Sequence, residues 1–281
     1  MANAYADLAT LKSASVLNAP DDAHDERLLT LLEAASRWID GYCGRQFGAS
    51  HGERRFDGTG KASLSVPDLV AASEVRVREA SGDWIGWPAS DWLLYPLNAA
   101  PTEPGGRPYT RIMLASGNRR RFPLSRAGVV VSGVWGYGDV REDLGLRVKE
   151  NAAVGDETVA VSAPGDGSVA LSAGHTIRID DEQLYVVGVS DDGEDTLTLT
   201  AQRGVNGTEP SAHAAGSAIT VYRYPKGVSE ACLLQAAVWW RERFGGPFVP
   251  PEGDGGDVGG VSPTVRTLLA PYRRRHAVLG V

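Results

Sequence analysis

The sequence has little of what marks disulfide-rich, zinc-binding or membrane proteins. Only two cysteines, Cys43 and Cys232, occur in 281 residues, and this count excludes a framework of several disulfides. The two lie far apart in the chain, not at the spacing of a zinc-binding pair. We expect both to be reduced, partly buried side chains, with a single bridge between two helices as the alternative.

Long apolar runs are also missing. The longest uncharged apolar stretch, Ala231–Trp240, is too short to cross a bilayer. The first ten residues, Met1–Thr10, are polar and acidic and do not form a basic-then-apolar leader. We therefore expect a soluble protein without a cleavable signal and without a membrane partner.

No catalytic constellation is present in the sequence. The five histidines are scattered: His24, His51, His175, His213 and His276. Gly58–Ala62 lacks the first glycine and the final hydroxyl of a phosphate-binding loop, so a plain hairpin turn is favoured there. The acidic run Asp191–Asp195 does not fit the spacing of a calcium loop, and Asp180-Asp181-Glu182 is interpreted as a hairpin turn. We expect no enzyme activity, catalytic residue, cofactor or metal site.

Charge is distributed unevenly along the chain. The net charge is -7, and 149–223 holds 12 acidic and 4 basic residues, a net of -8, which leaves +1 for the remainder. From Ser262 onward the sequence carries four arginines and no acid. An acidic middle and a basic end suggest two different neighbours, and the overall balance argues against binding nucleic acid along the whole surface. Arg119-Arg120-Arg121 is interpreted as an exposed turn, with contact to DNA or to an acidic partner as the alternative.

Apolar periodicity predicts helices near both ends of the chain. Positions three and four apart indicate a helix over 22–43, capped by Asp21 or Asp22 and ended by Gly44. A short helix is expected over 7–17 and another after Pro225. A last helix is expected to carry Val265, Leu268, Leu269 and Tyr272, with arginines in its final turn.

Between the helices the period changes to two, which is typical of strands. A hairpin is predicted from 54–56 and 62–66 across Asp57-Gly58, followed by strands at 75–77, 92–95, 109–114 and 129–135. The acidic segment adds strand candidates at 158–161, 168–171, 176–179, 184–189, 196–200 and 218–222. The expected fold class is α+β, with a helical core, a small antiparallel sheet and an inserted all-β domain.

Several segments resemble the head–tail connector (adaptor) family of tailed bacteriophages. The likeness covers about 4–138 and 225–275. It rests on Asp25–Phe47, Arg54–Gly58, Asp91–Asn98, Val134–Gly138 and Val261–Arg274. These are packing and turn patterns, not catalytic signatures. The family passes almost directly from the strand near Val134–Gly138 to the helix near Pro225, whereas here the acidic segment intervenes. Its runs Arg203–Thr208 and Ala212–Gly216 look similar to small β modules of other phage structural proteins.

This resemblance implies the domain organisation. A discontinuous connector core would comprise 1–148 and 225–249, an inserted β domain 149–224, and a flexible linker with a C-terminal docking helix 250–281. Members of this family form rings around a DNA channel, and the insert is expected to lie outside such a ring. The alternative is that its negative charge faces the channel and repels DNA.

The resemblance also implies a structural role at the virion neck, in a particle assembled in the host cytoplasm. The chain would form a homo-oligomeric ring of twelve subunits beneath the portal protein. The ring would extend the DNA channel without sequence-specific binding and offer a platform to stopper or tail proteins. The C-terminal end would dock on the portal, with Pro250–Gly260 as tether. The candidate interface residues are Val265, Arg266, Leu268, Leu269, Tyr272 and Arg273.

Alternatives stay open at two points. A short amphipathic helix is not stable alone, so the C-terminal helix needs a groove, from its own domain or from a partner. The chain could also be another neck or tail component, a stopper or a tail-terminator, although the long helices favour the adaptor. A glycan-binding module or enzyme that uses Trp84, Trp87 and Trp92 is the remaining alternative.

Overall fold

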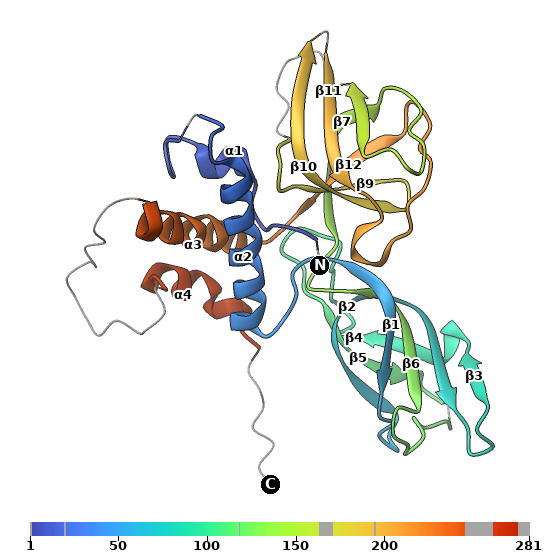
Figure 1. Cartoon of the computed structure of the whole chain (residues 1–281). Helices are drawn as coiled ribbons and strands as arrows, with labels where there is room; N and C mark the ends of the chain where they lie inside the picture. The colour runs from blue at the N-terminus through green and yellow to red at the C-terminus, as the bar shows by residue number, and fades with distance from the viewer. Residues whose placement is uncertain are drawn as a thin grey trace. The chain divides into compact units, whose positions relative to one another are not determined.

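The computed structural model describes residues 2–19, 21–117, 119–162, 171–193, 195–244 and 261–274. Among the described residues, 36% lie in strands and 23% in helices, so the protein is mostly antiparallel β and the predicted α+β fold with a helical core is wrong. The chain divides into two compact units (Figure 1): a sheet unit, 45–140, and a barrel unit, 1–44 with 141–281. The predicted domain boundaries at 149, 225 and 250 stay a prediction.

The sheet unit holds a six-stranded antiparallel sheet in the order β1-β6-β2-β5-β4, with β3 also paired to β2. The strands are β1 (Ser50–Phe56), β2 (Ser63–Arg78), β3 (Trp84–Trp87), β4 (Trp92–Tyr95), β5 (Tyr109–Leu114) and β6 (Val129–Trp135).

The hairpin predicted around Asp57-Gly58 is wrong. The strand β1 pairs with β6, from Ser50 opposite Trp135 to Phe56 opposite Val129, and β2 pairs with the other edge of β6. The strands β1 and β2 follow one another in the chain, but in the sheet β6 lies between them. The strand β6 begins over 70 residues after β1 ends. The three successive buried valines that open β6 fit a central strand that is covered on both faces.

Aromatic side chains fill the core of the sheet unit. Trp87 and Trp92 are each only 8% exposed, and Trp135 and Phe122 are fully buried. Two of the three tryptophans that a glycan-binding surface would need therefore serve as core, as aromatic residues in strands usually do. Trp84 is the one of the three that is exposed.

The barrel unit contains a closed antiparallel barrel in the order β10-β11-β8-β7-β12-β9. Its strands are β7 (Val140–Val148), β8 (Thr158–Ser162), β9 (Thr176–Ile179), β10 (Glu182–Gly193), β11 (Thr196–Gln202) and β12 (Ala218–Arg223). The strand β11 shows the expected alternation, with Leu197, Leu199 and Ala201 facing the core. The sequence did not predict β7, and most of the candidate strand at 168–171 lies outside the described residues.

The described part of the barrel unit also holds the α-helices α1 (Leu8–Lys12), α2 (Asp25–Cys43), α3 (Lys226–Phe244) and α4 (Pro263–Leu269). The predicted apolar face of α2 is confirmed, and Gly44 ends the helix in the left-handed conformation with φ of 64°. The predicted cap at Asp21 or Asp22 is wrong, because α2 begins at Asp25 after His24. Asp22 instead forms an ion pair with Lys12 at 2.7 Å.

Both cysteines are free thiols and both are buried. Burial raises the pKa of the Cys232 thiol to about 11. The helical bridge that the sequence left open is therefore not formed, and the reduced state is confirmed.

Within the described ranges, no helix has the length and apolar character needed to span a bilayer.

Candidate functional site

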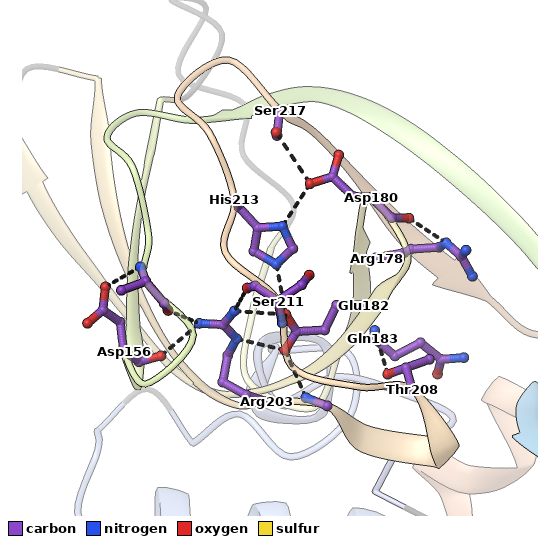
Figure 2. A network of polar contacts seen from close by, with 12 residues as sticks. Asp156, Arg178, Asp180, Glu182, Gln183, Arg203, Thr208, Ser211, His213 and Ser217 are labelled. Carbon is purple, nitrogen blue, oxygen red and sulfur yellow. Dashed lines mark hydrogen bonds and ion pairs between the residues drawn. The ribbon is translucent and has the colours of Figure 1, made fainter.

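A buried ion cluster lies at the end of the barrel where β9 turns into β10 (Figure 2). At its centre is the carboxylate of Glu182, the first residue of β10, which is 0% exposed. Arg203 approaches it with two parallel hydrogen bonds, from Nε at 2.7 Å and from Nη2 at 2.8 Å. The backbone N–H groups of Gly204 and Ser211 donate to the same carboxylate at 2.8 and 3.0 Å.

The guanidinium of Arg203 uses all five of its N–H donors. Besides the two bonds to Glu182, it donates to the carbonyl oxygens of Ala153, Asp156 and Ser211 at 3.1, 2.9 and 2.6 Å. One side chain thus joins the loop between β7 and β8 and the connection between β11 and β12 to the start of β10. Since the barrel strands are linked through these loops, the cluster fixes the end of the barrel.

His213 joins the cluster from the opposite side (Figure 2). Its ring is buried between two carboxylates, with Nε2 2.8 Å from Glu182 Oε2 and Nδ1 2.8 Å from Asp180 Oδ2. Both contacts are hydrogen bonds only when both ring nitrogens carry a proton.

The polar groups at the centre of this arrangement bond to one another within the protein. Both oxygens of Glu182 and every donor of Arg203 are engaged within the protein. A nucleophile or a general base needs a free valence that faces a substrate, and neither of these buried groups has one. The sequence singled out 203–208 and 212–216 only by likeness to other β modules, and the cluster explains why these residue types occur there.

The interpretation of Asp180-Asp181-Glu182 as a turn is half right. Asp180 and Asp181 form the turn between β9 and β10, with Asp180 at φ of 50°. Glu182 belongs instead to the strand, opposite Ile179. An available signal was its position two residues before the apolar run Leu184–Val187, because an acid at the buried head of a strand needs a cationic partner.

The acidity of Glu182 should make the barrel sensitive to low pH. Burial would raise the pKa of Glu182, but hydrogen bonds from Arg203, Ser211, Gly204 and His213 lower it from 4.5 to about 2. A depressed carboxyl pKa stabilises the folded state above pH 4.5, and this contribution is lost as the pH falls from 4.5 towards 2. We expect a loss of about 3 kcal/mol from this group, measured by urea unfolding at stepwise pH. A folding free energy that is unchanged across this range would contradict the expectation.

The C-terminal residues that the sequence predicted as portal anchors form a second candidate site. Val265 and Leu269 of α4 are fully buried, and α4 packs on α3. The approach of the two segments is close, since a Cβ at Gly227 of α3 would lie 3.4 Å from the Leu268 carbonyl oxygen. The sequence left open whether the groove for this helix comes from its own domain or from a partner. In the structure, this chain supplies the groove itself.

The chain after α4 continues to the C-terminal end of α2. The N–H of Arg274 donates to the carbonyl oxygen of Cys43 at 2.8 Å, one of the groups that a helix end leaves unpaired. The guanidinium of Arg273 lies 4.8 Å from the ring centre of Tyr42. The predicted placement of these arginines in the final helical turn is wrong, because α4 ends at Leu269.

The interface role of the six predicted residues stays a prediction. Arg273 is exposed, and Arg266, Leu268 and Tyr272 are half-buried, so these four side chains keep surface for a partner. The predicted tether Pro250–Gly260 and Arg275 lie outside the described residues.

Comparison with known proteins gives little further guidance. No protein-family model matches the chain, and no curated protein matches it. Among solved structures, a chain described as "Neck of empty GTA particle computed with C6 symmetry" is similar over 98% of this chain and 93% of its own length, with 15% sequence identity and a TM-score of 0.43. A likeness at this level decides neither the family nor the function.

Proposed function

We propose that this chain is a structural component of the neck of a tailed-phage particle, where it acts as a head–tail connector (adaptor) and not as an enzyme. It would form a ring beneath the portal, which the family resemblance implies to hold twelve subunits. The ring would surround the DNA path and offer a platform to stopper or tail proteins.

The observation that carries the proposal is the meeting of chain-distant segments that resemble this family. The helix α2, from the first resembling segment, contacts α3, whose Cys232 Sγ lies 3.5 Å from the Leu32 carbonyl oxygen. The C-terminal segment then packs on α3 through α4 and reaches α2 through Arg274. Segments that the sequence separates by about 200 residues thus support one another.

A second candidate is a stopper or tail-terminator. The sequence favoured the adaptor because of its long helices, and the predominance of strands removes much of that preference. The two candidates differ in their partner, because an adaptor binds the portal directly, whereas a stopper or terminator binds further along the neck or tail.

The proposal is tested by mixing the purified chain with purified portal rings and imaging the product by electron microscopy. We expect a ring of this chain on the tail-facing side of the portal. Binding to an assembled neck or tail tube but not to the bare portal would favour the second candidate. Binding to none of these would contradict both.

A charge variant sharpens the test. The double substitution Arg266→Glu with Arg273→Glu changes two side chains outside the buried face of α4 and should weaken portal binding at least tenfold. Lys226→Glu, an exposed charge reversal at the start of α3, is the matched control and should bind as the unchanged chain does. Equal portal binding by the unchanged chain, the double variant and the control would show that these arginines do not lie in the interface.

A further inference from the structure

The barrel unit carries an open groove of about 720 Å³ whose walls are α1, α2 and the neighbouring barrel strands. Its apolar floor includes Leu8, Leu29, Leu171 and Val189. The walls are tied together, because the N–H of Leu8 donates to the Ala173 carbonyl oxygen at 2.9 Å and the Tyr185 hydroxyl donates to Glu33 at 2.7 Å. The groove is therefore a preformed feature of this unit.

The rim of the groove is acidic. Its lining includes four carboxylates, from Asp25, Glu26, Glu33 and Asp191, against a single lysine, Lys12. That lysine is engaged, since its Nζ lies 2.6 Å from Asp25 and 2.7 Å from Asp22. A segment that combines an apolar side chain with arginines would match both the floor and the rim.

The sheet unit presents such a segment in the loop 119–126. Leu124 is 85% exposed, and Arg119, Arg121 and Arg126 are exposed around it. The loop is held in place by Phe122, which is fully buried with its ring 5.1 Å from that of Trp87.

Backbone hydrogen bonds from the segment at Gly58 and Gly60 also hold this loop. The N–H of Gly60 donates to the Phe122 carbonyl oxygen at 2.9 Å, and the N–H of Gly58 donates to that of Ser125 at 2.8 Å. A Cβ at Gly58 would lie 1.6 Å from the Pro123 carbonyl oxygen, so only glycine permits this approach. An anchored loop loses little entropy when it binds, which favours a role in recognition.

The two units also differ in overall charge. The sheet unit holds 12 basic and 9 acidic residues, a net of +3, so the barrel unit carries -7 minus +3, or -10. A duplex phosphate backbone would match the arginines of the loop but would give Leu124 no apolar contact. Burial of a leucine side chain contributes roughly 1.5–3 kcal/mol, so a partner with an apolar floor is favoured over DNA.

We infer that loop 119–126 of one copy docks in the groove of a neighbouring copy, with Leu124 on the apolar floor and the arginines against the acidic rim. The inference rests on the proposed function, for which it supplies the contact between neighbours in the ring. Because the two contacting surfaces differ, the interface is heterologous and repeats from copy to copy, and such an interface forms a ring when the rotation between copies closes.

Two complementary variants test this interface. A loop variant combines Arg119→Glu, Arg121→Glu and Leu124→Asp, and a groove variant combines Glu26→Lys with Asp191→Lys, all at exposed positions. By analytical ultracentrifugation, the unchanged chain should associate with rising concentration, and less so at high salt. Each variant alone should stay monomeric, whereas their mixture should form one-to-one dimers, because each keeps one intact surface. Association of either variant to the extent of the unchanged chain would overturn the inference.

Cross-linking gives a second readout that does not depend on affinity. Leu124→Cys in one preparation and Thr30→Cys, at the groove, in another should form an intermolecular disulfide on mixing, since both native cysteines are buried. Leu97→Cys, exposed in the same unit as Leu124, is the control and should not cross-link to Thr30→Cys. Equal cross-linking of the two would overturn the inference.

The outcomes also separate this inference from the proposed function. Portal-bound rings that form normally from the loop variant would overturn the inference and leave the connector role standing. Copies that cross-link as expected but never bind a portal would support the inference and contradict the connector role. If the loop variant assembles normally but loses retention of duplex DNA, the partner of the loop is DNA and the inference is overturned.

Discussion

Glu182→Gln should lower the free energy of unfolding of the barrel by about 3–5 kcal/mol. The amide cannot balance the charge of Arg203, whose side chain is 8% exposed. It also replaces an acceptor oxygen that now receives up to three hydrogen bonds by an NH₂ group that must donate. The cost is large because the guanidinium of Arg203 then stays buried without its counterion.

Glu142→Gln is the matched control for this substitution. Glu142 also lies on a barrel strand and also pairs with an arginine at 2.7 Å, Arg223, but its side chain is 54% exposed. Exposed ion pairs contribute roughly 0–1 kcal/mol, so this variant should differ little from the unchanged chain. The same substitution at the same pairing distance thus isolates the effect of burial.

The measurement should report on the barrel itself. The tryptophans of the chain all lie outside 141–223, so tryptophan fluorescence would follow the helices and the sheet unit instead. Amide hydrogen exchange read from peptides of β9, β10 and β11 follows the opening of the barrel directly. Comparable exchange in Glu182→Gln and Glu142→Gln would show that the cluster does not hold the barrel.

The sequence predicted local features of this fold well. The helix α2 was predicted within three residues at its start, because its apolar face repeats with a period that few other structures share. Gly44 was predicted as its end for a local reason, the left-handed conformation that glycine tolerates. The alternation of β11 likewise needs no information from elsewhere in the chain.

Pairing between distant strands could not be predicted in the same way. The hairpin interpretation joined β1 to β2 across the turn signal Asp57-Gly58, yet β6 lies between them. The overall balance of helix and strand was misjudged for a related reason. The strand β2 is 16 residues long with register shifts along it, and its irregular apolar pattern indicated only two short strands.

The buried ion cluster escaped prediction because its members are scattered. Arg203 lies 21 residues from Glu182, and His213 lies 31 residues from it. Each of these residues has an ordinary exposed role elsewhere in most proteins. The barrel closure brings them together, so the cluster follows from the fold and not from a local motif.

Leu269→Ala should destabilise the docking of α4 by about 2–5 kcal/mol, because the side chain is fully buried in the groove that this chain supplies. Leu268→Ala is the matched control, since it removes the same atoms from the adjacent, half-buried position and should cost less than half as much. Hydrogen exchange of peptides within 263–274 measures both effects. Equal exchange in the two variants would contradict the assigned orientation of the helix.

The same variant also bears on how the C-terminal segment meets a partner. If a portal bound α4 by its apolar face, the segment would first have to leave its own groove, and Leu269→Ala would ease that step while removing a contact. If instead the groove presents Arg266 and Arg273 in a fixed position, the loss of docking should weaken portal binding, because the binding-competent state becomes less populated. We expect the second result, because Val265 and Leu269 are already buried within the chain, whereas Arg266 and Arg273 keep surface for a partner. Portal binding that is stronger in Leu269→Ala than in Leu268→Ala would contradict this expectation.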